Sequence, residues 1–258
     1  MPSQRVLIPL PAYGFDPSEV AIPWKVLAEA GFDVRFATPT GAPAAPDRRM
    51  LGGHDLGIWK PLLRARADAV AAFAELERSP AFGRPLPYAE ARAADFAGLL
   101  LPGGHDKGVR EYLESTVLQG LVADFFAASK PVAAICHGVV LAARSMAPGT
   151  GRSVLHGYQT TALLKSQERA AYQLTRLWLK DYYLTYPEIT VEDEVSAALA
   201  DPAHFQRGPL PMRRDTRLQP ETGFVVRDRN YLSARWPGDA YRFALEFRHM
   251  LADLPTQR

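Results

Sequence analysis

Apolar and polar positions alternate in blocks that predict strands followed by helices. RVLIPL (Arg5–Leu10) is a short apolar run bounded by prolines, which is typical of a buried strand. DPSE (Asp16–Glu19) has an N-cap residue, a proline at the first helical position and an acid at the third, so it predicts a helix start; Gly31 ends that helix. DVRFATP (Asp33–Pro39) is the next strand. A strand, a helix and a strand within about 35 residues form a βαβ unit, which predicts a parallel sheet.

The alternation returns at residue 95 and continues to the end. The predicted strands are DFAGLLLPGG, KPVAAI, residues 154–163, FVVRD and NYLSA. The predicted helices are residues 115–128, the run VVLAARSM, and residues 167–179, 191–199 and 239–251. Two stretches interrupt this order: residues 41–92, with a helical pattern at 60–78, and the proline-rich residues 180–217. We therefore predict one α/β domain over residues 1–258, a doubly wound, mainly parallel sheet with helices on both faces and two insertions.

Composition narrows the class of protein and its partners. The 258 residues are 47% hydrophobic and 22% charged, the mixture of a globular protein. The net charge is only +2, so we expect neither nucleic acid nor an anionic membrane as a partner. No apolar run approaches the length of about 18 that spans a bilayer, and the N-terminus shows no signal-peptide core, so a cytoplasmic location is expected. The single cysteine excludes an internal disulfide, a CxxC pair and a multi-cysteine zinc site.

That cysteine, Cys136, lies in AICHG between the strand KPVAAI and the following helix. A nucleophile flanked by small residues at a tight strand-to-helix turn is the thiol counterpart of the G-x-S-x-G nucleophile elbow. Because the helix directs its positive end at the sulfur, we expect a reactive thiol that titrates well below the free value of about 8.5. The alternative is a small apolar core side chain, since cysteine is among the most buried residue types.

Two further groups are expected at the same edge of the sheet, beyond the carboxyl ends of the strands. Gly103-Gly104 follows a strand, and an amide there together with that of His137 forms an oxyanion hole in our interpretation. His105, beside this loop, is a candidate substrate contact. Glu19 has two interpretations: from its spacing alone it is a capping-box residue that complements the helix dipole, and otherwise it is a catalytic acid.

Four stretches together resemble the ThiJ/PfpI superfamily, which has the class I glutamine-amidotransferase-like, flavodoxin-like fold. They are GFDPSEVAIPWKVLAEAGFDVRFATPTG, DFAGLLLPGGHD, KPVAAICHG and VVRDRNYLSARWPGDA. The chain is most similar to the branch of glyoxalase III and heat-shock chaperones. The resemblance implies that Cys136 is the nucleophile, that His137 is its neighbouring histidine and that Gly104 is an oxyanion-hole donor. It also implies that Glu19 reaches the cysteine sulfur from the first helix, and it implies a homodimer.

The triad acid is less uniform among the relatives. Glu168 in GYQTTALLKSQE matches the glutamate-type members, whereas Lys165 stands where the aspartate-type members have their acid. The alternative for Glu168 is a solvated glutamate in the first turn of a helix. Glutaminase activity is not expected, because Tyr186-Pro187-Glu188 lacks the histidine of the His-Pro-Glu string that such an enzyme needs.

The resemblance implies two classes of function. The first is a cofactor-independent enzyme acting on small reactive carbonyls, converting methylglyoxal to lactate as glyoxalase III does, or a related hydrolase or hydratase. The second is a stress protein, either a holdase chaperone or a thiol redox sensor. No GxGxxG or P-loop is present, so no cofactor is expected. No metal is expected either, because the other histidines show no ligand spacing; these are His54, His156, His204 and His249.

Overall fold

The computed structural model describes residues 4–211 and 213–254 and has a seven-stranded sheet at its centre. The strand order is β5-β3-β1-β6-β7-β9-β8, and every neighbouring pair is parallel except the edge pair β8 and β9. The strands are β1 (Arg5–Pro9), β3 (Asp33–Thr38), β5 (Leu86–Pro87), β6 (Gly98–Leu101), β7 (Val132–Ile135), β8 (Val225–Asp228) and β9 (Tyr231–Ala234). A separate pair, β2 (Tyr13–Phe15) and β4 (Ala45–Pro46), lies beside it. The predicted mainly parallel α/β sheet is confirmed.

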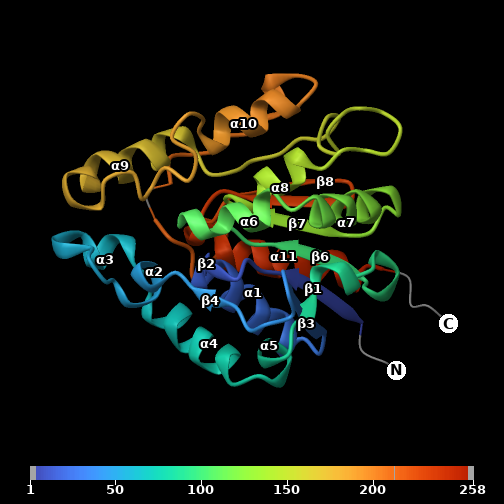
Figure 1. Cartoon of the computed structure of the whole chain (residues 1–258), viewed down its shortest axis with the longest axis horizontal. Coiled ribbons are helices and arrows are strands. Elements are labelled where there is room, and N and C mark those ends of the chain that lie inside the picture. Colours follow the sequence, from blue (N-terminus) through green and yellow to red (C-terminus); the bar gives the residue numbers. More distant parts are fainter. Residues whose placement is uncertain (1–3, 212, 255–258) are drawn as a thin grey trace.

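Helices cover both faces of this sheet (Figure 1). The helices α1 and α11 pack against each other on one face, and α7 and α8 pack against each other on the opposite face. The longer helices are α1 (Pro17–Glu29), α4 (Ala67–Glu77), α7 (Thr116–Ala127), α8 (Gly138–Arg144), α9 (Lys165–Leu179), α10 (Val191–Ala198) and α11 (Ala240–Ala252). The shorter ones are α2 (Arg48–Gly52), α3 (Lys60–Leu63), α5 (Pro80–Gly83) and α6 (Arg110–Leu113). None of the helices in the described part of the chain is long and apolar enough to cross a bilayer.

Two predicted elements differ in the structure. Residues 154–163 are not a strand: they form turns, with one isolated bridge between Thr160 and Phe205. The strand β9 already pairs with β7 on one edge and β8 on the other, so no edge is left for this run, and the Thr161 amide bonds to the Ser233 hydroxyl at 2.9 Å instead. The helix predicted at 60–78 is broken into α3 and α4, because Arg64 and Arg66 are extended and Ala65 donates to the carbonyl of Met50.

The two insertions meet at the carboxyl ends of the central strands. Both add side chains to the main core, such as Phe73 from residues 41–92 and Val195 from residues 180–217. A smaller apolar cluster also joins them, formed by Met50 and Leu56 of the first insertion, Tyr182 and Tyr183 of the second, and Leu179 at the end of α9. In Figure 1 this end is on the left, where α2, α3 and α9 lie, away from both chain termini. This arrangement agrees with the single domain over residues 1–258, which itself stays a prediction.

Candidate active site

The sole cysteine lies at a sharp turn between β7 and α8. Cys136 has a φ of 57°, in the left-handed region that a side chain rarely adopts, and it is completely buried. After it come His137, the N-cap of α8, and Gly138, the first residue of that helix; a Cβ at Gly138 would lie 2.1 Å from the carbonyl oxygen of Leu101 in β6. Strand, strained residue and helix therefore follow one another as the predicted nucleophile elbow requires.

Glu19 is turned away from the start of its helix and toward this elbow. The N-cap of α1 is Asp16, whose carboxylate accepts from the amides of Ser18 at 2.7 Å and Glu19 at 3.2 Å. The carboxylate of Glu19 instead accepts from the amide of Gly103 at 2.8 Å, while the Asp16 amide donates to the Gly103 carbonyl. In a capping box the carboxylate of Glu19 would accept from the amide of Asp16, but both of these groups bond to Gly103 instead. The capping-box interpretation of Glu19 is therefore wrong.

The glycine pair after β6 packs closely against the elbow. A Cβ at Gly103 would lie 2.6 Å from the backbone nitrogen of His137, and one at Gly104 would lie 2.4 Å from the carbonyl oxygen of Gly14. Only glycines allow these approaches. Because the Gly103 amide donates to Glu19, it is occupied in this state. Gly104 and His137 are then the remaining candidates for the oxyanion-hole amides.

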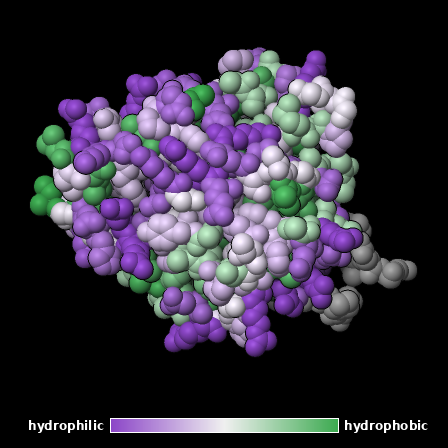
Figure 2. Space-filling model, in the orientation of Figure 1, coloured by the Kyte–Doolittle hydropathy of each residue, from purple (hydrophilic) through white to green (hydrophobic). Residues whose placement is uncertain are grey.

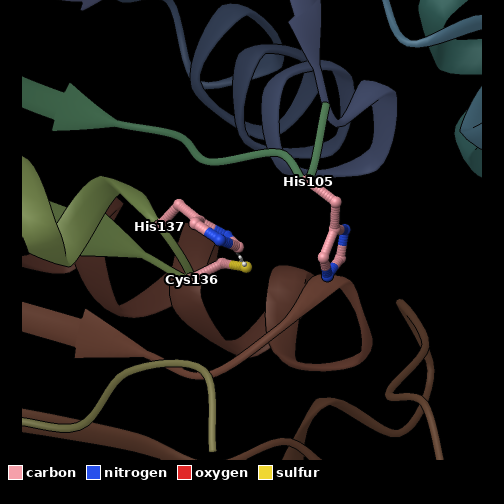
Figure 3. A group of neighbouring side chains, drawn as sticks. All are labelled: His105, Cys136 and His137. Carbon is pink, nitrogen blue, oxygen red and sulfur yellow. Dashed lines mark hydrogen bonds between the residues drawn. The ribbon is translucent and has the colours of Figure 1, made fainter. Parts of the chain in front are cut away.

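Two histidines flank the sulfur (Figure 3). Nδ1 of His137 lies 3.4 Å from Sγ of Cys136, and the rings of His137 and His105 meet edge to face with centroids 5.2 Å apart. One nitrogen from each imidazole and the sulfur all lie within 4.8 Å of one another. Nδ1 of His105 and Nε2 of His137 are buried and have no hydrogen-bond partner among the described residues. The structure thus places His105 beside the elbow, and its predicted contact with substrate stays a prediction.

Part of the predicted insertion at residues 180–217 lies against this group, although none of its residues was a candidate for the site. We call residues 180–186 the strap. Its Tyr183 ring packs edge to face on His105 with centroids 5.0 Å apart, and its Thr185 hydroxyl donates to the carbonyl of His105 at 2.9 Å. Tyr182 donates to Asp47 in the other insertion. Cys136 and His137 have no exposed surface, and His105, against which the strap packs, is 8% exposed.

Burial controls the protonation of the site. It raises the pKa of the Cys136 thiol well above its ordinary value, and the carboxylates of Glu19 and Asp16 raise it further. Burial also raises the pKa of Glu19, with Asp16 adding to the effect, and lowers the pKa of His105 to about 4. The expected depression of the thiol pKa is therefore wrong for this closed state, because desolvation and two nearby acids outweigh the short helix α8. At neutral pH the closed site holds a thiol and neutral imidazoles.

Glu168 is not brought to His137. It lies in the first turn of α9, is 1% exposed, and its carboxylate accepts from the amide of Val191 at the start of α10 at 3.1 Å. No hydrogen bond joins it to His137 among residues 4–211 and 213–254. The alternative of a solvated glutamate is wrong, since the side chain is buried. The orienting role that the resemblance implies for Glu168 stays a prediction.

Glu168→Gln is expected to flatten the pH dependence of stability. Burial raises the pKa of Glu168 from 4.5 to about 7. Between these values the folded chain keeps a proton that the unfolded chain has lost, so this group lowers the free energy of unfolding as pH rises from about 4.5 to about 7. The share amounts to about 2–3 kcal/mol. Glutamine matches the protonated acid and still accepts from Val191.

Urea unfolding of the wild type and Glu168→Gln at pH 5 and pH 8 measures this share. The exposed Glu188 supplies the matched control, Glu188→Gln, which should leave the difference between the two pH values unchanged. Equal pH dependence in the wild type and Glu168→Gln would show that Glu168 ionises as readily in the folded chain as in the unfolded one.

Comparison with known proteins bears on the family and on the fold of this chain. A family model described as ThiJ/PfpI family-like matches residues 10–208. An uncharacterized protein from Schizosaccharomyces pombe is 31% identical over 123 residues, which are 47% of this chain and 45% of that protein. One from Archaeoglobus fulgidus is 39% identical over 102 residues, which are 36% of this chain and 60% of that protein. The match thus spans about half of the length of these curated relatives.

Solved structures show the same fold at low sequence identity. Glyoxalase III from Candida albicans superposes with a TM-score of 0.69 at 17% identity, over 96% of this chain and 97% of that one. DJ-1beta from Drosophila melanogaster superposes with a TM-score of 0.53 at 20% identity, over 98% of this chain and 92% of that one. These likenesses confirm the predicted fold class.

Proposed function

Since the chain belongs to the ThiJ/PfpI family, we propose that it is a cofactor-independent cysteine enzyme acting on small 2-oxoaldehydes. The observation that carries the proposal is the buried thiol of Cys136, which lies between the carboxyl of Glu19 and the imidazole of His137. A nucleophile with two proton carriers beside it and water excluded suits an internal proton transfer. The fold likeness to a glyoxalase III supports the same substrate class.

The proposed reaction converts methylglyoxal and water to lactate without an external oxidant. The sulfur of Cys136 adds to the aldehyde carbon, and the thiol proton moves to the aldehyde oxygen to give a hemithioacetal. The proton on that carbon is removed and returned to the neighbouring carbon through an enediol, which leaves a thioester of the 2-hydroxy acid. Water then cleaves the thioester, releasing lactate and restoring the thiol.

The position of each residue in the site gives it a candidate role in this reaction. The amides of Gly104 and His137 are the candidates to hold the developing oxyanion. Glu19 is the candidate proton carrier, because burial raises its pKa and so favours the protonated form, from which it can give as well as accept a proton. His137, 3.4 Å from the sulfur, is the candidate acceptor of the thiol proton.

Lactate formation tests the proposal directly. Purified protein is incubated with methylglyoxal in the absence of glutathione and metals, and lactate is quantified. Amides, isocyanides and peptides in the same assay test the related hydrolase and hydratase alternatives. Turnover of methylglyoxal supports the proposal, and turnover confined to another class of electrophile replaces it.

Glu19→Gln is expected to lower turnover by roughly 10²-fold or more, because it removes the transferable proton while keeping the size of the side chain. Its amide oxygen can still accept from Gly103, so the free energy of unfolding should change by less than about 1 kcal/mol. Steady-state rates and urea unfolding on the same preparations separate the two effects. The control is Glu90→Gln, at an exposed position far along the chain. Near-wild-type turnover in Glu19→Gln would leave the proton transfers to His137.

A second candidate, a holdase chaperone, is favoured by a specific surface. Apolar side chains are exposed on α9 and around α3, at the left end of the molecule, where Figure 2 shows hydrophobic atoms. They are Ile58, Leu62, Leu174, Leu177 and Trp178. Exposed apolar side chains gathered at one end of a molecule suit binding to unfolded chains. A redox sensor is favoured less, because the thiol is buried and its pKa is raised, whereas sensors need an accessible thiolate.

A further inference from the structure

Three side chains able to bind a metal ion converge where only nucleophilic chemistry was expected. His105, Cys136 and His137 come from the loop after β6, the elbow and its next residue, and their donor atoms lie within 4.8 Å of one another. Figure 3 shows the His137 ring beside the sulfur and His105 across from it. The four other histidines, at positions 54, 156, 204 and 249, take no part in this group.

Both imidazoles keep one unused nitrogen. Nδ1 of His105 and Nε2 of His137 are buried without a hydrogen-bond partner among the described residues. On His137 the nitrogen that faces the sulfur is Nδ1. No bond to the unused nitrogens therefore has to break when the rings adjust to a ligand.

The spacing fits a small tetrahedral ion. Donor atoms around tetrahedral zinc lie about 3.3–3.6 Å apart, given Zn–N of about 2.0–2.1 Å and Zn–S of about 2.3 Å. Sγ of Cys136 and Nδ1 of His137 are already 3.4 Å apart. The other donor-atom distances in the group are at most 4.8 Å, so His105 completes the set by moving up to about 1.5 Å through rotation about its side-chain bonds. The strap supports His105 from outside through Tyr183 and Thr185.

We propose that His105, Cys136 and His137 bind one zinc ion. Two imidazoles and one thiolate are ligands that Zn²⁺ prefers and that Mg²⁺ and Ca²⁺ do not. On binding, the S–H bond breaks, the S–Zn bond forms and the proton leaves to solvent, while each imidazole donates a lone pair. The sulfur then shares with zinc the lone pair that a nucleophilic attack needs, so bound Zn²⁺ inhibits any reaction of Cys136. Binding itself does not depend on the substrate class proposed above.

Binding is measured on the full chain after treatment with a chelator and its removal. Competition with a chromophoric zinc indicator gives stoichiometry and affinity, and CoCl₂ replaces zinc as a spectroscopic probe. We expect one Zn²⁺ per chain with sub-micromolar affinity, and a thiolate-to-cobalt charge-transfer band in the near ultraviolet. His105→Gln and Cys136→Ala should each weaken zinc binding by at least about 100-fold, since each removes one of three ligands. His54→Gln, at an exposed histidine, is the matched control and should bind as the wild type does.

X-ray absorption of the zinc-loaded wild type needs no variant. It should show one sulfur at about 2.3 Å and imidazole nitrogens at about 2.0 Å. Any of three results overturns the proposal: the wild type binds less than one zinc per chain, the coordination shell contains no sulfur, or His105→Gln binds zinc as tightly as the wild type. If the protein binds zinc but forms no lactate, the zinc site is supported and only the proposed reaction is refuted. If it forms lactate but binds no zinc, the reaction is supported and the zinc site is refuted.

Discussion

Cys136→Ala is expected to abolish turnover of 2-oxoaldehydes, with a loss of roughly 10⁴-fold or more in kcat, because no other group can form the covalent bond to the aldehyde carbon. Cys136 is the only thiol in the chain, so the loss cannot be rescued by a neighbour. The expected change in the free energy of unfolding is small, about 1 kcal/mol, since one buried sulfur atom is removed from a site that already tolerates a strained backbone. Steady-state rates and urea unfolding on the same preparation test both statements.

The same variant separates the two candidate functions. A holdase that works through the apolar side chains of α9 and α3 does not use the sulfur, so Cys136→Ala should suppress aggregation of an unfolding client as well as the wild type does. Loss of turnover with retained aggregation suppression would mean that both activities exist in one chain. Retained turnover in Cys136→Ala would refute covalent catalysis by this residue.

Gly138→Ala is expected to destabilise the fold by at least about 3 kcal/mol, because its methyl group would collide with backbone rather than with a side chain that can move. The new Cβ would lie 2.1 Å from the carbonyl oxygen of Leu101 and 2.7 Å from that of Pro102. The strand β6 is paired on both edges, with β1 and β7, so it cannot yield without breaking the centre of the sheet. Chemical denaturation measures the loss in the free energy of unfolding. A failure of the variant to express in soluble form is the extreme form of the same result.

Gly120 offers the matched control for that substitution. It is exposed in the middle of α7, and a Cβ there would meet nothing within 4 Å. Gly120→Ala should therefore stabilise the chain by about 0.5–1 kcal/mol through helix propensity alone. If Gly138→Ala behaved like Gly120→Ala, the close contact between the elbow and β6 would not exist in solution.

Local patterns were enough to predict the architecture, because each central strand is a short apolar run that is buried on both faces. RVLIPL and KPVAAI became β1 and β7, and Ser115 caps α7 where a helix start was expected. The prediction failed at residues 154–163, whose apolar and β-branched residues do pack inside. Whether such a run becomes a strand depends on a free sheet edge, and only the tertiary structure shows that β9 has none.

The sequence predicted which residues form the candidate site better than it predicted the chemistry of those residues. Spacing along the chain brought Cys136, His137 and the Gly103-Gly104 loop to one edge. The direction of the thiol pKa came out opposite to the expectation, because the complete burial of Cys136 depends on long-range packing that no local pattern of the sequence shows. Likewise the turn of Glu19 away from its helix start depends on the amide of Gly103, 84 residues later in the chain.

The complete burial of the only cysteine makes its alkylation rate a measure of how often the native chain opens. An alkylating reagent can react with Cys136 only during a fluctuation that uncovers it, so the labelling rate equals the opening equilibrium constant multiplied by the rate for a free thiol, when reclosure is fast. A substrate must enter through an opening of the same kind, so the opening frequency sets a ceiling on kcat. Labelling kinetics on the unmodified protein thus reports the gating frequency of the molecule without any engineered probe.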